Sequence, residues 1–206
     1  FLTGTVRETA QFGSHSITAG PVGNDDLFVA KIDTWGNWLW VEGVDCHNNG
    51  RCVGTSIVVD SNGYAYVTGS FSRDMTFGTT TLSWAGVEDI FVAKIDTWGN
   101  WQWASMAGGG QGSDKAHSIA IGPSGNAFIT GYFQFTATFD GSASNNSLTV
   151  IGGSDVFIAK ISQQGDWIWT MAAGGISTSH ANSIAVDSQG GVFISGYFYS
   201  DISFGN

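Results

Sequence analysis

The sequence predicts an all-β repeat protein with almost no helix, and two internal repeats carry this prediction. The elements DLFVAKIDTWGNWLW and SIVVDSNGYAYVTGSF each occur three times, with successive starts 62 to 66 residues apart. Copies of the first element span residues 26–40, 89–103 and 155–169, and copies of the second span 56–71, 118–133 and 183–198. Self-similarity at a fixed period indicates units that each bury an apolar face against their neighbours.

The composition favours short strands joined by tight turns. The 206 residues include 30 Gly, 14 Phe and 9 Trp but only 2 Pro, and aromatic residues suit strands whereas glycine suits turns. The formal net charge of −10 repels nucleic acid, so we expect no nucleic-acid partner. No apolar run approaches the ~20 residues that cross a bilayer, so we expect no membrane insertion. The sequence starts at Phe1 without a signal-peptide pattern, and a targeting segment could precede it.

One repeat, beginning at Ser56, can be followed strand by strand. An apolar run meets the turn formers DSNG at 60–63, which predicts a hairpin with the strand that follows. Phe71, Met75 and Phe77 then alternate, which predicts a long strand or an inserted hairpin. Further strands are expected at 89–96 and from Trp101, and a glycine-rich link leads to the next unit.

Four antiparallel strands with an inserted hairpin are typical of a β-propeller blade. Blades of ~40–50 residues are usual, so a repeat of about 63 residues requires the insertion. We expect a partial blade with strands 2 to 4, two complete blades, and a partial blade with strands 1 and 2, at 1–53, 54–115, 116–180 and 181–206. This is an incomplete propeller arc, so the favoured interpretation is a piece of a longer propeller or repeat array. The alternative is a ring assembled from several copies, such as a homodimer.

The repeated motifs also resemble a known family. SIAVDSQGGVFISGYF at 183–198, an alternating strand ending in Phe-Gly, the D-x-F-x-A-K-I-D pattern and the Trp-rich strand are similar to SBBP repeats, and the pattern is related to NHL-type blades. The resemblance covers essentially the whole chain. It implies long β-propeller repeats of a secreted or cell-surface prokaryotic protein. Gly122-Pro123 and the stretch SQQ at 162–164 depart from the other copies.

The two cysteines, Cys46 and Cys52, enclose a short polar loop that turns at Asn-Gly. So small a loop can bring the two Cα atoms within disulfide range, and we predict a disulfide. The alternatives are two free thiols, or a zinc site that would use His47 and still lack a fourth ligand. A disulfide indicates an oxidising compartment, so an extracellular or cell-surface location is expected. The glycosylation pattern Asn145-Asn146-Ser147 fits the same setting.

The tryptophans fall into two groups. The doublets recur at one strand position in every unit, so we expect them to pack between blades; they are Trp38 and Trp40, Trp101 and Trp103, and Trp167 and Trp169. Trp35 and Trp98 follow a strand in a turn, where they are candidates for ligand contact.

Charged residues also recur at fixed positions. Lys31, Lys94 and Lys160 occupy one equivalent position, and Asp26, Asp89 and Asp155 occupy another. We expect each lysine to pair with a nearby acid, either in this aspartate series or on the next blade. Calcium sites need six to eight oxygens in a spaced loop, so Asp25-Asp26 and Glu88-Asp89 are interpreted as solvated turn residues. No metal and no cofactor are expected, and the four histidines do not align between units.

These features predict a non-enzymatic structural or adhesive interaction module of an extracellular or cell-surface β-propeller protein, with no catalytic residues. Its blades would present loops to a protein or glycan surface, or to further copies of the same repeat. The most divergent loop, 44–53, is the first candidate contact surface, through His47, Asn48, Asn49 and Arg51. One alternative is a carbohydrate-binding propeller that uses Trp35 and Trp98. Another is a propeller-based lyase or glycosidase, whose acids from different blades would converge on one opening.

Overall fold

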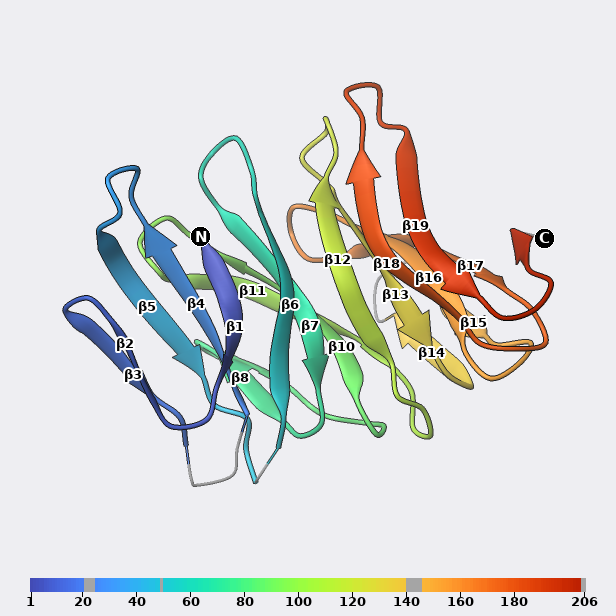
Figure 1. Cartoon of the computed structure of the whole chain (residues 1–206), viewed down its shortest axis with the longest axis horizontal. Helices are drawn as coiled ribbons and strands as arrows, with labels where there is room; N and C mark the ends of the chain where they lie inside the picture. The colour runs from blue at the N-terminus through green and yellow to red at the C-terminus, as the bar shows by residue number, and fades with distance from the viewer. Residues whose placement is uncertain (21–24, 49, 140–145, 205–206) are drawn as a thin grey trace.

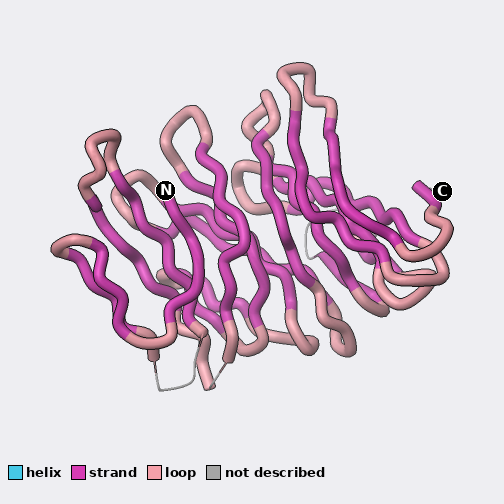
Figure 2. The backbone as a smooth tube through the Cα atoms, viewed as in Figure 1, coloured by secondary structure: helices cyan, strands magenta, loops and turns pink. Residues whose placement is uncertain are grey.

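The computed structural model describes residues 1–20, 25–48, 50–139 and 146–204. Within these residues the chain forms twenty strands and no helix, which confirms the all-β prediction (Figures 1 and 2). Two residues named above, Asn49 and Asn145, lie outside the described residues. The sheets follow one another along the long axis of the molecule, and their first strands β6, β12 and β18 lie next to one another in that order.

The strands are short and bounded by turns. They are β1 (Leu2–Val6), β2 (Thr9–Phe12), β3 (His15–Thr18), β4 (Asp26–Ile32), β5 (Trp38–Val44), β6 (Cys52–Val59), β7 (Ala65–Phe71), β8 (Met75–Phe77), β9 (Thr80–Leu82), β10 (Asp89–Ile95), β11 (Trp101–Gly108), β12 (Lys115–Ile121), β13 (Ala127–Phe133), β14 (Thr136–Phe139), β15 (Ser147–Thr149), β16 (Asp155–Ile161), β17 (Trp167–Gly174), β18 (Ser179–Val186), β19 (Val192–Phe198) and β20 (Ser203–Phe204).

Each sheet is an antiparallel meander. The second sheet has the order β6-β7-β10-β11 and the third has β12-β13-β16-β17, whereas the first holds β1-β4-β5 and the last holds β18-β19. The turns between the third and fourth strands share one mechanism, because a side-chain oxygen accepts backbone N–H groups two and four residues ahead; the acceptor is an aspartate in the first two turns and Ser162 in the third. Asp96, for example, accepts from Trp98 N at 2.8 Å and from Asn100 N at 2.9 Å.

The strands β14 and β20 link neighbouring sheets, whereas the hairpins β2-β3 and β8-β9 form separate two-stranded sheets. Although β14 precedes β16 in the chain, it pairs with β11 of the preceding sheet through Ala107↔Phe139 and Gly108↔Thr138. In the same way β20 pairs with β17 through Ala173↔Phe204. Neither strand therefore extends its own sheet; each covers the free edge of the sheet before it, which satisfies backbone groups that an edge strand otherwise leaves unpaired.

Hydrogen bonds and apolar contacts also join the first strands. Each strand carries a bulge at one equivalent position, which is Thr55 in β6, His117 in β12 and Asn182 in β18. A bulge turns a side chain away from its own ladder. Thr55 Oγ1 donates to Ala116 O of the next sheet at 2.8 Å, and His117 Nδ1 lies 2.7 Å from Ala181 O. Beneath these bonds, buried residues of neighbouring sheets form continuous apolar clusters.

Candidate interaction surface

The recurring lysines stand in a row with aromatic residues on both sides. Lys94 of β10 lies opposite Tyr66 of β7 and Trp103 of β11, and its ammonium group is 4.8 Å from the centre of the Tyr66 ring. The same row is formed by Phe1, Lys31 and Trp40 and by Phe128, Lys160 and Trp169, with both ammonium groups 5.3 Å from the phenyl ring. A cation over an aromatic face is stabilised by the ring quadrupole.

The expectation of a nearby acid is met for Lys94, but both predicted locations, the Asp26 series and the next blade, are wrong for it. Lys94 instead forms an ion pair with Asp60, at 3.8 Å, in its own sheet. The reason lies in strand geometry, because Asp89 and Lys94 are five positions apart on β10. An odd separation puts their side chains on opposite faces, and at ~3.3 Å per residue the two Cα atoms lie about 16 Å apart.

The row also fastens each sheet to the next. Lys31 Nζ donates to Thr97 O at 3.0 Å, and Trp40 Nε1 donates to the same carbonyl at 3.1 Å. One sheet further on, Trp103 Nε1 donates to Gln163 O at 2.9 Å, and Lys94 Nζ lies 3.5 Å from that oxygen. The second tryptophan of each of these doublets thus lies at a contact between sheets.

The first tryptophan of each doublet packs edge-on against a phenylalanine of the inserted hairpin. The ring centres of Trp38 and Phe12, Trp101 and Phe77, and Trp167 and Phe139 are 5.0, 4.8 and 5.1 Å apart. Edge-to-face pairs of this kind add to the stabilisation that burial provides. These tryptophans hold the hairpins against the sheets.

Asp26, Asp89 and Asp155 are buried, and their carboxylates bind backbone amides instead of facing solvent. Asp26 accepts from Gly20 N and from Cys46 N, at 2.6 and 3.0 Å. Asp89 accepts from Ala85 N and Gly86 N at 2.7 and 3.1 Å, and Asp155 accepts from Ile151 N and Gly175 N at 2.9 and 3.3 Å. The interpretation of Asp26 and Asp89 as solvated turn residues is wrong, because each fixes the loops that meet at the start of its strand.

The residue before each of these aspartates pairs with the first strand of the following sheet. Asp25 accepts a hydrogen bond from Arg7 and another from Arg51 Nε at 2.9 Å, and Arg51 Nη1 also lies 3.8 Å from Glu88. Lys115 Nζ lies 2.5 Å from Glu88 Oε2. The Arg7 hydrogen bond, followed by that of Arg51, holds the pKa of Asp25 below its usual value against the effect of burial. Five charged groups of alternating sign therefore join three sheets.

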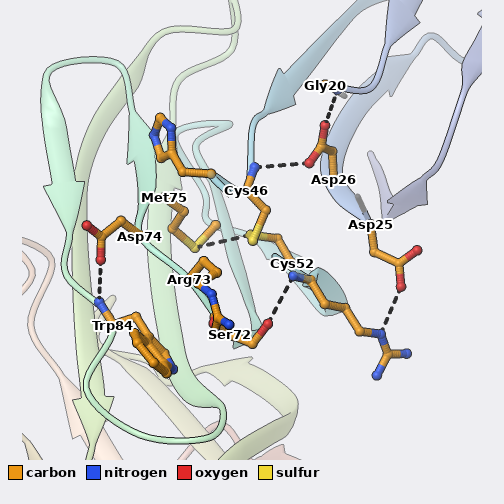
Figure 3. The surroundings of a disulfide bond; sticks show 12 residues. Gly20, Asp25, Asp26, Cys46, Cys52, Ser72, Arg73, Asp74, Met75 and Trp84 are labelled. Carbon is orange, nitrogen blue, oxygen red and sulfur yellow. Dashed lines mark hydrogen bonds and ion pairs between the residues drawn. A yellow bond between two sulfur atoms is a disulfide. The ribbon is translucent and has the colours of Figure 1, made fainter. Parts of the chain in front are cut away.

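Next to this charged row lies the disulfide loop (Figure 3). Cys46 and Cys52 form a disulfide with a Cα–Cα distance of 5.7 Å, and both side chains are fully buried. The loop between them is tied down on both sides, since Cys52 N donates to Asp25 O at 2.6 Å and His47 N donates to Asp74 O at 3.0 Å. The disulfide and these two backbone hydrogen bonds therefore hold the described ends of the loop.

Arg73 and Trp84 complete this surface, although neither belongs to a repeated sequence motif. The Arg73 guanidinium lies 4.5 Å from the centre of the Trp84 ring, and Trp84 N donates to the Asp74 carboxylate at 2.9 Å. Trp84 is 38% exposed. The Arg73 side chain also packs against the disulfide loop, because a Cβ added at Gly50 would lie 2.7 Å from Arg73 Cβ. We name the surface formed by His47, Asn48, Arg51, Arg73 and Trp84 the disulfide face.

Trp35 and Trp98 lie far from the disulfide face along the strands. They occupy the turns that precede β5 and β11, whereas the disulfide loop follows β5. Both are strongly exposed, at 85% and 74%, and each backbone N–H is held by the aspartate two residues before it. The equivalent position in the third turn is Gln164, so only two turns present an indole.

Two groups of titratable side chains meet between sheets, although their sequence positions do not reveal it. Asp89 and Asp114 are both fully buried, and Asp89 Oδ1 and Asp114 Oδ2 have no hydrogen-bond partner. Burial raises the pKa of Asp114 to about 7, and the charge of Asp89 adds to this effect. Because neither carboxyl is accessible, this pair offers no site for hydrolysis of a sugar chain.

The second group surrounds His180. Ser154 Oγ is 2.9 Å from His180 Nε2, Tyr197 OH is 2.8 Å from His180 Nδ1, and Tyr132 stacks on the imidazole ring at 3.8 Å. Burial, together with the nearby His117, lowers the pKa of His180. Ser154 is almost completely buried, so its hydroxyl cannot reach a substrate. Ser154 and His180 stand where the preceding sheets place the ion pairs of Asp25 with Arg51 and of Glu88 with Lys115.

Within the described residues, no three side chains of the metal-binding types gather around one point. The same part of the chain has no long apolar helix of the kind that could cross a lipid bilayer.

Comparison with known proteins identifies a viral relative. No protein-family model matches the chain. A protein of Acanthamoeba polyphaga mimivirus, named as the uncharacterized WD repeat-containing protein L264, is 27% identical over 183 residues. The match covers 81% of this chain and 13% of the viral protein. Together with the series of antiparallel sheets, this similarity supports a β-propeller-like repeat protein.

Proposed function

We propose that the chain is a protein-interaction module built from propeller repeats of the SBBP kind, and that the disulfide face is its contact surface. The observation that carries the proposal is the Arg73–Trp84 stack beside a loop that a buried disulfide and backbone hydrogen bonds hold in place. Tryptophan and arginine are the residues most often found at energetic centres of protein interfaces. A contact surface that is already ordered loses little conformational entropy on binding.

Charge gives the disulfide face a preference among partners. The chain has a net charge of −10, and its three arginines, Arg7, Arg51 and Arg73, all lie near this loop. Asp25 neutralises part of the positive charge of Arg7 and Arg51. The described partners of the Arg73 guanidinium are the Trp84 ring and the Ser72 carbonyl, neither of which carries a charge. A protein partner with a carboxylate near an apolar group would match Arg73 and Trp84 together. The buried disulfide supports an extracellular or cell-surface location for this contact.

A matched pair of variants tests the proposal. The chain and its Trp84→Ala and Trp98→Ala variants are immobilised, and proteins retained from the surface fraction of the source cells are quantified by mass spectrometry. We expect retention of at least one protein to fall about tenfold or more with Trp84→Ala and to stay unchanged with Trp98→Ala. Trp98→Ala is the matched control, because it also removes an exposed tryptophan. Equal retention by all three proteins contradicts the proposal.

A second candidate function is carbohydrate binding, and the exposure of Trp35 and Trp98 favours it. Both indoles stand on turns fixed by aspartate side chains, and sugar rings stack on such flat apolar surfaces. A glycan array with the chain and its Trp98→Ala variant tests this function. Signals that Trp98→Ala leaves unchanged rule it out, and signals that it abolishes would favour the turns over the disulfide face.

A further inference from the structure

In the last sheet, one edge of β19 is open, although the equivalent edge is paired in the other sheets. β19 pairs with β18 on one side, and none of the described strands pairs with its other side. The equivalent strands β7 and β13 each lie between two partners, which are β6 and β10 for β7 and β12 and β16 for β13. β19 therefore presents free backbone donors and acceptors in extended geometry (Figure 1).

The side chains of β19 are apolar and exposed where their equivalents are buried. Phe193 is 62% exposed and Phe198 is 55% exposed. The corresponding residues of β13, Phe128 and Phe133, are buried against β16. Phe193 and Phe198 are five positions apart, so they lie on opposite faces of β19. Large apolar groups exposed on both faces of a strand, where the equivalent residues of β13 are buried, are typical of an edge that another chain segment covers.

Three existing contacts define what fits this edge. In each earlier sheet the third strand places a phenylalanine opposite a glycine of the second strand, in the pairs Gly4↔Phe28, Gly69↔Phe91 and Gly131↔Phe157. The hydroxyl before that glycine donates to the phenylalanine carbonyl; Thr3, Thr68 and Thr130 do so at 2.9, 2.8 and 2.7 Å. In β19 the same two positions are Ser195 and Gly196, and the Ser195 side chain is exposed.

A cavity of about 110 Å³ lies beside Gly196, lined by Ile194, Phe198, Ile202 and Phe204 among others. In the earlier sheets the phenylalanine of the third strand contacts the phenylalanine of the inserted hairpin. The distances between ring centres are 5.1 Å for Phe28 and Phe12, 5.5 Å for Phe91 and Phe77, and 5.6 Å for Phe157 and Phe139. Phe204 is the hairpin residue of the last sheet and is 73% exposed. The cavity is thus the place of a missing aromatic ring.

We infer that the β19 edge is a docking site for an extended segment of the pattern Asp-x-Phe-x-Ala-Lys, the third strand of a further repeat of this kind. Such a segment adds antiparallel to β19, with its phenylalanine opposite Gly196 and inside the cavity. Its phenylalanine carbonyl accepts from Ser195 Oγ, and its lysine stands over the Phe193 ring, as Lys160 stands over Phe128. Backbone pairing supplies affinity, and the aromatic pocket supplies specificity.

A second copy of residues 1–206 is a poor source of this strand. Its three matching strands, β4, β10 and β16, are each paired on both sides. Each would have to give up a partner before it could add to β19. The inference is independent of the disulfide face, which involves other sheets, so either can fail without the other.

A peptide in trans tests the site. The probe is a fluorescein-labelled peptide with the sequence of residues 155–169, which supplies a third strand, its turn and the tryptophan strand. We expect saturable binding to the chain by fluorescence anisotropy. The same peptide with Phe157→Ala should bind roughly tenfold or more weakly, because it leaves the cavity empty. No binding, or equal binding of the two peptides, overturns the inference.

Variants of the chain supply matched controls. Ser195→Ala should weaken peptide binding by about two- to tenfold through loss of one hydrogen bond, and Phe204→Ala should weaken it further. Thr130→Ala removes the same kind of hydroxyl from β13, which already has both partners, and should leave peptide affinity unchanged. If sedimentation shows a dimer of the chain that Phe204→Ala dissolves and the peptide does not, a second copy occupies the edge and the inference is wrong.

Discussion

Trp40 donates its indole N–H to the carbonyl of Thr97, a residue 57 positions further along the chain and in the next sheet. The same carbonyl also accepts from Lys31. One turn of the following sheet is therefore held by two side chains of the sheet before it. This contact converts a local sequence repeat into a series of sheets with defined spacing.

Trp40→Phe should lower the free energy of unfolding by about 1 kcal/mol or somewhat more, since the ring is retained while the N–H to Thr97 is lost. Urea titration followed by circular dichroism measures this change. Trp35→Phe serves as the control, because Trp35 is exposed and should give no measurable change. Equal effects of the two substitutions would show that Trp40 does not hold the neighbouring turn.

Stability should fall as the pH rises, through Asp114. The folded pKa of this carboxyl is about 7, raised mainly by burial, whereas its ordinary value is 3.8. The folded chain therefore binds this proton more tightly than the unfolded chain, so stability declines between about pH 4 and pH 7. Asp114→Asn keeps an oxygen for Gln134 N and removes the charge, so it should stabilise the chain at pH 8 by roughly 1–4 kcal/mol and have little effect at pH 4.

Urea titrations of both proteins at the two pH values measure this difference. Ser124→Asn, an exposed substitution, serves as a control for general effects of the solvent conditions. A destabilisation by Asp114→Asn of the same size at both pH values contradicts a titrating buried carboxyl.

Removal of the disulfide should cost about 2 kcal/mol, the loop-closure value for so short a loop. Cys46→Ser with Cys52→Ser, compared with the parent chain by calorimetry, measures this cost. The larger effect is expected in binding, because the loop fixes His47 and Arg73. Under the proposed function, the double variant should lose retention of the same proteins as Trp84→Ala. Unchanged retention would separate the disulfide from the contact surface.

Gly69→Ala should be severe. A Cβ at this position would lie 1.8 Å from the Val53 carbonyl oxygen and 2.9 Å from the Phe91 ring. Both neighbours are fixed in the sheet, so we expect a loss of about 3 kcal/mol or more, as for other overpacked core sites. Gly36→Ala is the control, since its Cβ would meet open space and only the φ of 90° opposes it. Comparable stabilities of the two variants would contradict the close approach of β6, β7 and β10.

The positions of the strands could be predicted from the sequence, but not all of their pairing partners could. Repeated turn formers such as DSNG at 60–63 act within a few residues, so the hairpins they form could be predicted. The pairing of β14 with β11 could not, because it depends on which sheet edge lies nearest in space. The expected pairing of Lys94 with Asp89 could have been excluded from the sequence, because an odd separation on one strand already places the two side chains on opposite faces.

The disulfide face, which we propose as the contact surface, was predictable only in part. The divergence of the loop at 44–53 pointed to His47 and Arg51, and the spacing of Cys46 and Cys52 pointed to the disulfide. Trp84 and Arg73 gave no signal, because they neither repeat nor lie near that loop in the sequence. They stack because the hairpin β8-β9, which lies between them in the sequence, brings its two ends together.

Hydrogen exchange of the indole N–H groups tests the packing of the sheets most directly. Trp40, Trp103 and Trp167 donate to carbonyls of neighbouring sheets, whereas Trp35 and Trp98 are exposed. In two-dimensional NMR spectra of the chain labelled at tryptophan nitrogen, the first three signals should exchange at least tenfold more slowly than the last two. Uniformly fast exchange of all five signals would contradict a protein whose sheets are joined through their tryptophans.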